Sequence, residues 1–234
     1  GEGTYAAIFV AAMESAAFVI NDIRTLINIG LSKIPADCRM TRSIKLLLDC
    51  YDNGVDWKDA RNKLVEDSAD LGWFEAPANV AFSMLGMLYG EGDFKKSMIL
   101  AINCGDDTDC TAATVGATLG IIGGTKSIPE DWKEFIGDRI ITVSVNGSYN
   151  WSTPKTCSEL TERVAKLVPE IMKANSIEFE FTNDKNELKS LRKKRGDYTI
   201  KEFTKDPYED SELRVAANAL AVVSKRNKDL ENSD

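Results

Sequence analysis

The sequence predicts a mainly α fold, because apolar residues recur at helical spacing throughout its first 140 positions. Residues typical of helix ends and helix starts separate these periodic segments, as in Asn53-Gly54 followed by Asp56. Hydrophobic residues make up 43% of the 234 positions, which is enough for a globular core. We therefore expect six to eight helices with short loops up to residue 140.

The first helices can be placed from their apolar patterns. Residues 4–21 are apolar almost all round, which predicts a helix buried on most sides. A short helix is expected over 22–32, where Gly30 and Pro35 end the pattern. A third helix is expected over 40–52, with its apolar residues on one face.

The following helices have clear starting residues. Asp56 is expected to cap a helix with one buried face, because Asp is a preferred N-cap residue. Residues 79–89 form another apolar helical segment, and Asp93 precedes the next one. A small-residue helix is expected over 108–123, and Pro129 opens a last short helix.

The sequence changes character after residue 140. Residues 140–145 and 177–181 are typical of strands, and the latter segment alternates with period two. Thr156 and Glu159 have the spacing of a capping box at the start of an amphipathic helix. Residues 213–223 fit either a helix or a strand.

These patterns predict a division of the chain into two parts. Residues 1–140 would form a helical domain, and residues 141–234 a smaller α+β region of unknown role. The basic residues Lys189 and 192–195 form a short run without aromatic residues, which is typical of a solvated surface.

Charge and residue types exclude several classes of function. The net charge of −8 argues against nucleic acid or an anionic membrane as a partner. Histidine is absent, which excludes Ser-His-Asp catalysis, His general bases and His-ligated zinc. The five scattered cysteines contain no C-x-x-C motif, so a reducing compartment, the cytoplasm, is expected.

One acidic cluster stands out, the segment 105–113. Three carboxylates within four residues repel one another unless a cation or helix N–H groups stabilise them. At a helix N-terminus, the carboxylates of Asp107 and Asp109 can converge on one point. The cluster is therefore either a site for Mg²⁺, or less readily Mn²⁺ or Ca²⁺, or a helix cap in which Asp106 or Asp107 is the N-cap residue.

The helix behind the cluster carries small residues at three- and four-residue intervals: Ala113, Gly116, Ala117 and Gly120. We expect another helix to approach this stripe closely and to hold the acidic end in a crevice. The aromatic residues Trp73, Phe74 and Trp151 are expected to be packing residues rather than adenine-stacking ones.

At the acidic cluster, the sequence resembles the ADP-ribosylglycohydrolase family. The resemblance covers about residues 1–140 and rests on the central motif and its surroundings: Gly105, Asp107-Thr108-Asp109-Cys110, Ala112-Ala113, Val115-Gly116, Gly92-Asp93-Phe94, Ala101-Ile102-Asn103, Ile128-Pro129, Trp132, Ala11-Ala12-Met13, Ala17-Phe18, Gly30-Leu31 and Ile34-Pro35. It implies an all-α orthogonal bundle around two Mg²⁺ ions, with Mn²⁺ as an alternative. The implied activity is hydrolysis of the bond between ADP-ribose and a protein side chain or a related acceptor.

The resemblance also implies roles for individual residues. Asp107 and Asp109 would be metal ligands, and Cys110 would be a weak one, because it stands where many members have threonine and a neutral thiol is a poor Mg²⁺ ligand. Asn103 and Gly105 would contact the substrate. Asp106 stands where the family has glycine or an aromatic residue. No catalytic residue can be assigned.

The family's N-terminal metal motif, a Thr or Ser followed by two aspartates, does not occur in this sequence. We therefore expect the C-terminal part of the domain, whose partners would be its own N-terminal half and an ADP-ribosylated protein or a small ADP-ribose-like ligand. The alternative function is a non-catalytic, truncated or diverged member that binds a nucleotide, a metal or a protein.

Overall fold

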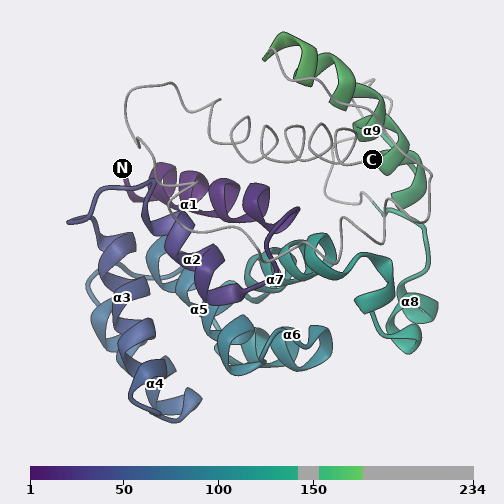
Figure 1. Ribbon diagram of the computed structural model, residues 1–234. Coiled ribbons are helices and arrows are strands. Elements are labelled where there is room, and N and C mark those ends of the chain that lie inside the picture. The colour runs from purple at the N-terminus through teal and green to yellow at the C-terminus, as the bar shows by residue number, and fades with distance from the viewer. Residues whose placement is uncertain (142–152, 176–234) are drawn as a thin grey trace, which may run out of the picture.

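The computed structural model describes residues 1–141 and 153–175, and this part of the chain is mainly helical (Figure 1). It contains no strand within those ranges. The helices are α1 (Glu2–Ala17), α2 (Ile23–Leu31), α3 (Arg39–Asp52), α4 (Trp57–Asp67), α5 (Ala76–Tyr89), α6 (Phe94–Asn103), α7 (Thr108–Gly123), η1 (Thr125–Ser127), α8 (Glu130–Ile136) and α9 (Cys157–Ala174). Eight α-helices thus lie before residue 140, as the apolar periodicity predicts.

Aspartate side chains start three of these helices. Asp22, Asp56 and Asp93 precede α2, α4 and α6, and each accepts a hydrogen bond from a backbone N–H group two or three residues further on. An N-cap of this kind satisfies an N–H group that has no partner within the helix. The predicted cap at Asp56 is therefore confirmed.

Helix α5 lies at the centre of the bundle and packs against α1, α2, α3, α4, α6 and α7 (Figure 1). Most of its side chains are buried, including Phe82 and Met84. Helix α6 approaches it closely at Gly86, because a Cβ atom there would lie only 2.6 Å from the carbonyl oxygen of Ser97. This contact sets the direction of α6, which leads to the acidic cluster.

The small-residue stripe of α7 packs only in part within the described residues, because a Cβ atom at Gly116 would lie 3.6 Å from the Met98 sulfur on α6. The buried residues of α7 are Thr111, Val115, Thr118 and Leu119. Ala113 and Ala117 are exposed. The predicted close approach of another helix is therefore seen at Gly116, whereas the predicted crevice is wrong, because Asp109 and Cys110 are exposed. The α7 segment is apolar or small on both sides, so its spacing alone did not identify the buried face.

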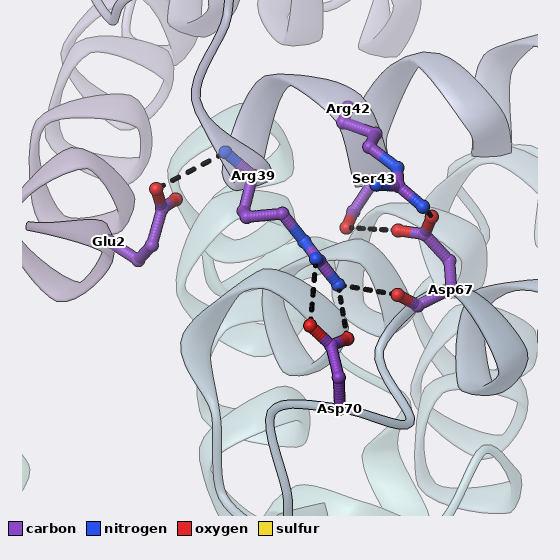
Figure 2. Close-up of polar contacts among 6 residues, drawn as sticks. All are labelled: Glu2, Arg39, Arg42, Ser43, Asp67 and Asp70. Carbon is purple, nitrogen blue, oxygen red and sulfur yellow. Dashed lines mark hydrogen bonds and ion pairs between the residues drawn. The ribbon is translucent and has the colours of Figure 1, made fainter.

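The connection between α4 and α5 is tied to α3 by a polar network (Figure 2). The Arg39 guanidinium donates to both carboxylate oxygens of Asp70, at 2.8 and 3.1 Å, and to the carbonyl oxygen of Asp67. Arg42 pairs with the Asp67 carboxylate, which also accepts from Ser43. The Arg39 guanidinium holds the pKa of Asp70 below its ordinary value.

The N-terminus of α3 has an unusual cap, because its partner comes from another helix. The Glu2 carboxylate on α1 accepts a hydrogen bond from the backbone N–H group of Arg39 at 3.2 Å (Figure 2). It also accepts one from the N–H group of Met40 at 2.8 Å. A carboxylate there also interacts favourably with the helix dipole. Glu2 therefore fixes the start of α1 against the start of α3.

Replacing Glu14 with glutamine is expected to stabilise the protein at pH 7. Glu14 lies half-buried between α1 and α7, where its carboxylate accepts from the Thr118 hydroxyl at 3.4 Å. Burial raises its pKa above the ordinary value of 4.5. The folded state therefore binds more protons than the unfolded state above pH 4.5, and stability falls as pH rises through this window. Urea unfolding at several pH values should show that the free energy of unfolding falls less with rising pH for Glu14→Gln than for the wild type. The exposed Glu66→Gln control should follow the wild type.

After residue 140, the described segment contains α9. Thr156 caps this helix by accepting from the Glu159 N–H group at 3.0 Å, and the Glu159 carboxylate accepts from the N–H group of Lys155. The capping-box prediction is confirmed, although the Glu159 carboxylate accepts from the residue before the cap rather than from Thr156 itself. Residues 140–141 of the predicted strand 140–145 form no strand, and the rest of that segment lies outside the described residues. The predicted strand at 177–181, the segment 213–223, the basic run and Trp151 also lie outside them.

The part of the chain that the structure describes offers no helix with both the length and the apolar character needed to cross a bilayer. The proposed division at residue 140 remains a prediction.

Candidate metal centre

The turn between α6 and α7 carries the acidic cluster. Helix α6 ends at Asn103 and α7 begins at Thr108, as predicted. Gly105 has φ +81° and Asp106 has φ +59°, so two left-handed residues reverse the chain direction between the helices. Glycine adopts this conformation without strain, whereas an aspartate adopts it at some cost.

The structure brings Asp107, Asp109 and Cys110 together. One potential ligand atom from each lies within 4.8 Å of the other two. Asp107 is the N-cap residue of α7 by position, but its side chain makes no capping hydrogen bond. Its carboxylate is therefore not used to cap the helix, and the simple N-cap interpretation does not explain this residue.

The exposure of this trio differs from the predicted crevice. Asp107 is half-buried, whereas Asp109 and Cys110 are exposed among the described residues. A cation there would be approached from solvent, and water would supply part of its coordination. This arrangement fits Mg²⁺, which usually keeps several waters and takes one or two carboxylates from the protein.

Two of the three residues in the trio, Asp107 and Asp109, offer donor atoms that suit a hard divalent cation. Carboxylate oxygens are the ligands preferred by Mg²⁺ and Mn²⁺. Cys110 is less suitable, because a hydrogen bond to the Asp107 carboxylate raises the pKa of its thiol. The protonated thiol is a weak, soft donor, so Asp107 and Asp109 are the principal candidate ligands.

Asp106 does not join the trio, because its carboxylate is used elsewhere. Its Oδ1 accepts from the backbone N–H group of Phe74 at 3.2 Å, and its Oδ2 accepts from the Asn79 side-chain amide at 3.0 Å. The Asn79 amide oxygen in turn accepts from the backbone N–H group of Asp107 at 3.1 Å. Asn79 therefore connects Asp106 to the start of the candidate metal-binding pair.

The role of Asn79 was not predicted from the sequence. The residue is only 7% exposed and lies within the apolar helix α5, where a buried amide needs hydrogen-bonding partners. An isolated Asn in an otherwise apolar helical segment is the signal that could have identified it. Its partners in the acidic cluster, Asp106 and Asp107, lie 27 and 28 residues further along the chain, and no local pattern predicts them.

The prediction that Trp73 and Phe74 are packing residues is wrong. Trp73 is 80% exposed and Phe74 is 64% exposed. Both lie in the α4–α5 connection, and Trp73 lines a cavity of about 290 Å³ whose walls also include Arg61 and Asp106. Arg61 donates from Nε to the carbonyl oxygen of Cys104 at 2.9 Å, which ties α4 to the end of α6.

A family model described as ADP-ribosylglycohydrolase matches residues 1–169. The chain belongs to the ADP-ribosylglycohydrolase family. The match extends past residue 140, where the motifs that carry the resemblance end. No curated protein and no solved structure matches the chain significantly.

Membership of the ADP-ribosylglycohydrolase family indicates a glycohydrolase-type function at the level of the family. The family is generally metal-dependent, which is consistent with a cluster of candidate ligands at the α7 N-terminus. The helical architecture of the described residues also agrees with the all-α fold of this family.

The two predicted substrate-binding residues lie just before the trio. Asn103 is exposed at the last position of α6, and Gly105 is half-buried in the turn. A Cβ atom at Gly105 would lie 3.7 Å from an Arg61 guanidinium nitrogen, so the position is open rather than crowded. Their contact with substrate remains a prediction.

Proposed function

We propose that the chain is part of a Mg²⁺-dependent hydrolase of ADP-ribosyl or related N- and O-glycosidic bonds. The observation that supports this most strongly is the convergence of Asp107 and Asp109 at the α7 N-terminus. Their carboxylates would hold the cation, with Cys110 as a weak third ligand. We also propose the cytoplasm as its location, because its five cysteines are free thiols.

The bound cation would supply electrostatic orientation of ribose hydroxyls and activation of a water molecule near the anomeric carbon. Residues of this chain position the candidate metal ligands. The Asn79 side chain accepts from the N–H group of Asp107, and the left-handed residues Gly105 and Asp106 form the turn that leads into α7. Asn103 and Gly105 would contact the substrate beside the pair.

The trio supplies too few hard ligands for the two Mg²⁺ ions expected in a complete domain. We propose that the remaining protein ligands come from a polypeptide segment equivalent to the family's N-terminal half. The exposed stripe of α7 with Ala113 and Ala117 is a suitable place for that segment, because small residues allow a close approach beside the trio. The substrate would be an ADP-ribosylated protein or a small ADP-ribose-like ligand.

The alternative function is non-catalytic binding of a nucleotide, a metal or a protein partner. The observation that favours it is the same shortage of ligands among the described residues, one of which is a cysteine rather than a carboxylate. The two functions differ in turnover, because a binding protein would retain the ligand without releasing ADP-ribose.

The experiment that tests the proposed hydrolase activity measures release of ADP-ribose from N-linked and O-linked ADP-ribosyl peptides. It should be run with the chain alone and with a separately expressed N-terminal half of a family member, in Mg²⁺, Mn²⁺ or EDTA. We expect release with a divalent cation and none in EDTA. Metal binding without release under all of these conditions would favour the non-catalytic function.

Replacing Cys110 with serine is expected to tighten Mg²⁺ binding about three- to tenfold, because a hydroxyl is a harder ligand than a thiol. Calorimetric titration with Mg²⁺ measures the change. Cys157→Ser is the matched control, since Cys157 is also an exposed cysteine at a helix start but lies outside the trio. Equal affinities for Cys110→Ser and the wild type would remove residue 110 from the ligand set.

A further inference from the structure

We propose that Asp106 is a positioning residue that couples the aromatic turn, residues 72–75, to the metal ligand Asp107. In this arrangement, order in the aromatic turn and binding of a cation by Asp107 and Asp109 reinforce each other. The inference rests on the proposed function in one respect, that the pair binds a divalent cation.

The coupling follows an unbroken set of hydrogen bonds across three segments. Asp106 accepts from the Phe74 backbone with one carboxylate oxygen and from the Asn79 amide with the other. Asn79 also donates to the carbonyl oxygen of Glu75 at 3.1 Å and accepts from the Asp107 N–H group. The turn, the start of α5 and the start of α7 are therefore held by two side chains.

Packing contributes little to holding the aromatic turn. The side chains of Trp73 and Phe74 are mostly exposed, and Trp73 lines the cavity of about 290 Å³. Phe74 also has φ +62°, a left-handed conformation that is unfavourable for a bulky residue. Hydrogen bonds to an ionised acceptor are stronger than those between neutral groups. The bond to the Asp106 carboxylate is therefore the interaction that keeps Phe74 in this conformation.

Asp106 is itself left-handed, with φ +59°. Glycine would adopt this conformation more easily, so the aspartate needs a compensating interaction. Its two carboxylate bonds provide one, and both lead away from the acidic cluster. This explains why a third carboxylate lies beside the pair without facing it.

The α4–α5 connection, which contains the aromatic turn, has a second anchor that is separate from the metal pair. Near the end of α4, Arg39 donates to the Asp70 carboxylate and to the carbonyl oxygen of Asp67 (Figure 2). Loss of the Arg39 anchor should loosen the connection without altering Asp107. Loss of the Asp106 anchor should loosen the connection and also alter Asp107, because Asp106 is linked to Asp107 through Asn79.

The test combines a binding measurement with a measurement of order in the turn. Mn²⁺ affinity is obtained by calorimetry, and the rate of chymotryptic cleavage after Trp73 and Phe74 is obtained by mass spectrometry of the fragments. In the wild type we expect saturating Mn²⁺ to slow this cleavage at least threefold. Coupling between two sites is reciprocal, so the variants that loosen the turn through Asp106 should also bind Mn²⁺ less tightly.

Four variants separate the possible causes. Asn79→Ala changes no charge and should weaken Mn²⁺ binding at least threefold while speeding cleavage. Asp106→Gly should do the same and should abolish the effect of Mn²⁺ on cleavage. Arg39→Met should speed cleavage but leave Mn²⁺ affinity within twofold of the wild type. Asp109→Asn should lose Mn²⁺ binding but keep the wild-type cleavage rate without metal. Circular dichroism confirms that each variant is folded.

The outcomes distinguish this inference from the proposed function. If the wild type binds Mn²⁺ and both Asn79→Ala and Asp106→Gly bind it within twofold as tightly, the coupling is overturned while the metal site stands. If Arg39→Met weakens binding as much as Asn79→Ala, general loosening of the connection explains the effect and Asp106 has no special role. If the wild type binds no Mn²⁺, the proposed metal-dependent function fails and the coupling fails with it.

Discussion

Replacing both Asp107 and Asp109 with asparagine is expected to abolish stabilisation of the protein by Mg²⁺ or Mn²⁺. These carboxylates converge within 4.8 Å and are the two hard donors of the trio. A cation that binds only the folded state at about 100 times its dissociation constant stabilises a protein by about 2.7 kcal/mol. Thermal unfolding with and without the cation measures this effect, which should vanish in the double variant.

The control for this experiment must lose the same charge elsewhere. Glu66→Gln with Glu134→Gln removes two exposed carboxylates from α4 and α8. This control should keep the full metal-dependent rise in melting temperature. An undiminished rise in the Asp107→Asn, Asp109→Asn protein would show that the cation binds at another place.

Replacing Gly86 with alanine is expected to destabilise the protein by roughly 2–3 kcal/mol, because adding bulk to a well-packed contact forces backbone shifts. The new Cβ atom would lie 2.6 Å from the Ser97 carbonyl oxygen and 2.7 Å from the Ala101 Cβ atom. The first is a backbone atom and the second is a Cβ atom, whose position the backbone fixes, so neither can rotate away. Helices α5 and α6 would have to separate, and the turn that carries Asp107 would move with α6.

Urea unfolding measures this loss, and Gly120→Ala provides the comparison. Gly120 is also inside a helix, but a Cβ atom there would have no neighbour within 4 Å in the described structure. Alanine has a higher helix propensity, so Gly120→Ala should be neutral or stabilise by up to about 1 kcal/mol. Equal stabilities for the two variants would contradict the close α5–α6 contact.

The features that could be predicted from the sequence depend on neighbouring residues. The cap at Asp56 and the capping box at Thr156 follow from rules that span two to four residues, and the structure confirms both. The convergence of Asp107 and Asp109 was predicted in the same way, because the geometry of a helix N-terminus is local. The helices of the first 140 residues followed from apolar periodicity.

The features that could not be predicted depend on distant segments. The bonds from Asp106 to Phe74 and Asn79 cross 32 and 27 residues. The burial of α7 depends on which of two similar faces meets α1, α5 and α6, and small residues on both faces give no answer. The exposure of Trp73 likewise follows from the path of the α4–α5 connection, which its composition does not specify.

The most direct test of the metal site is a crystal structure of the protein grown with Mn²⁺, with anomalous scattering recorded at the manganese edge. We expect an anomalous peak at the α7 N-terminus, bound by carboxylate oxygens of Asp107 and Asp109 at about 2.1 Å, the distance typical of small hard cations. Well-defined carboxylates of Asp107 and Asp109 that point apart into solvent, with no peak between them, would contradict the proposed metal-dependent function.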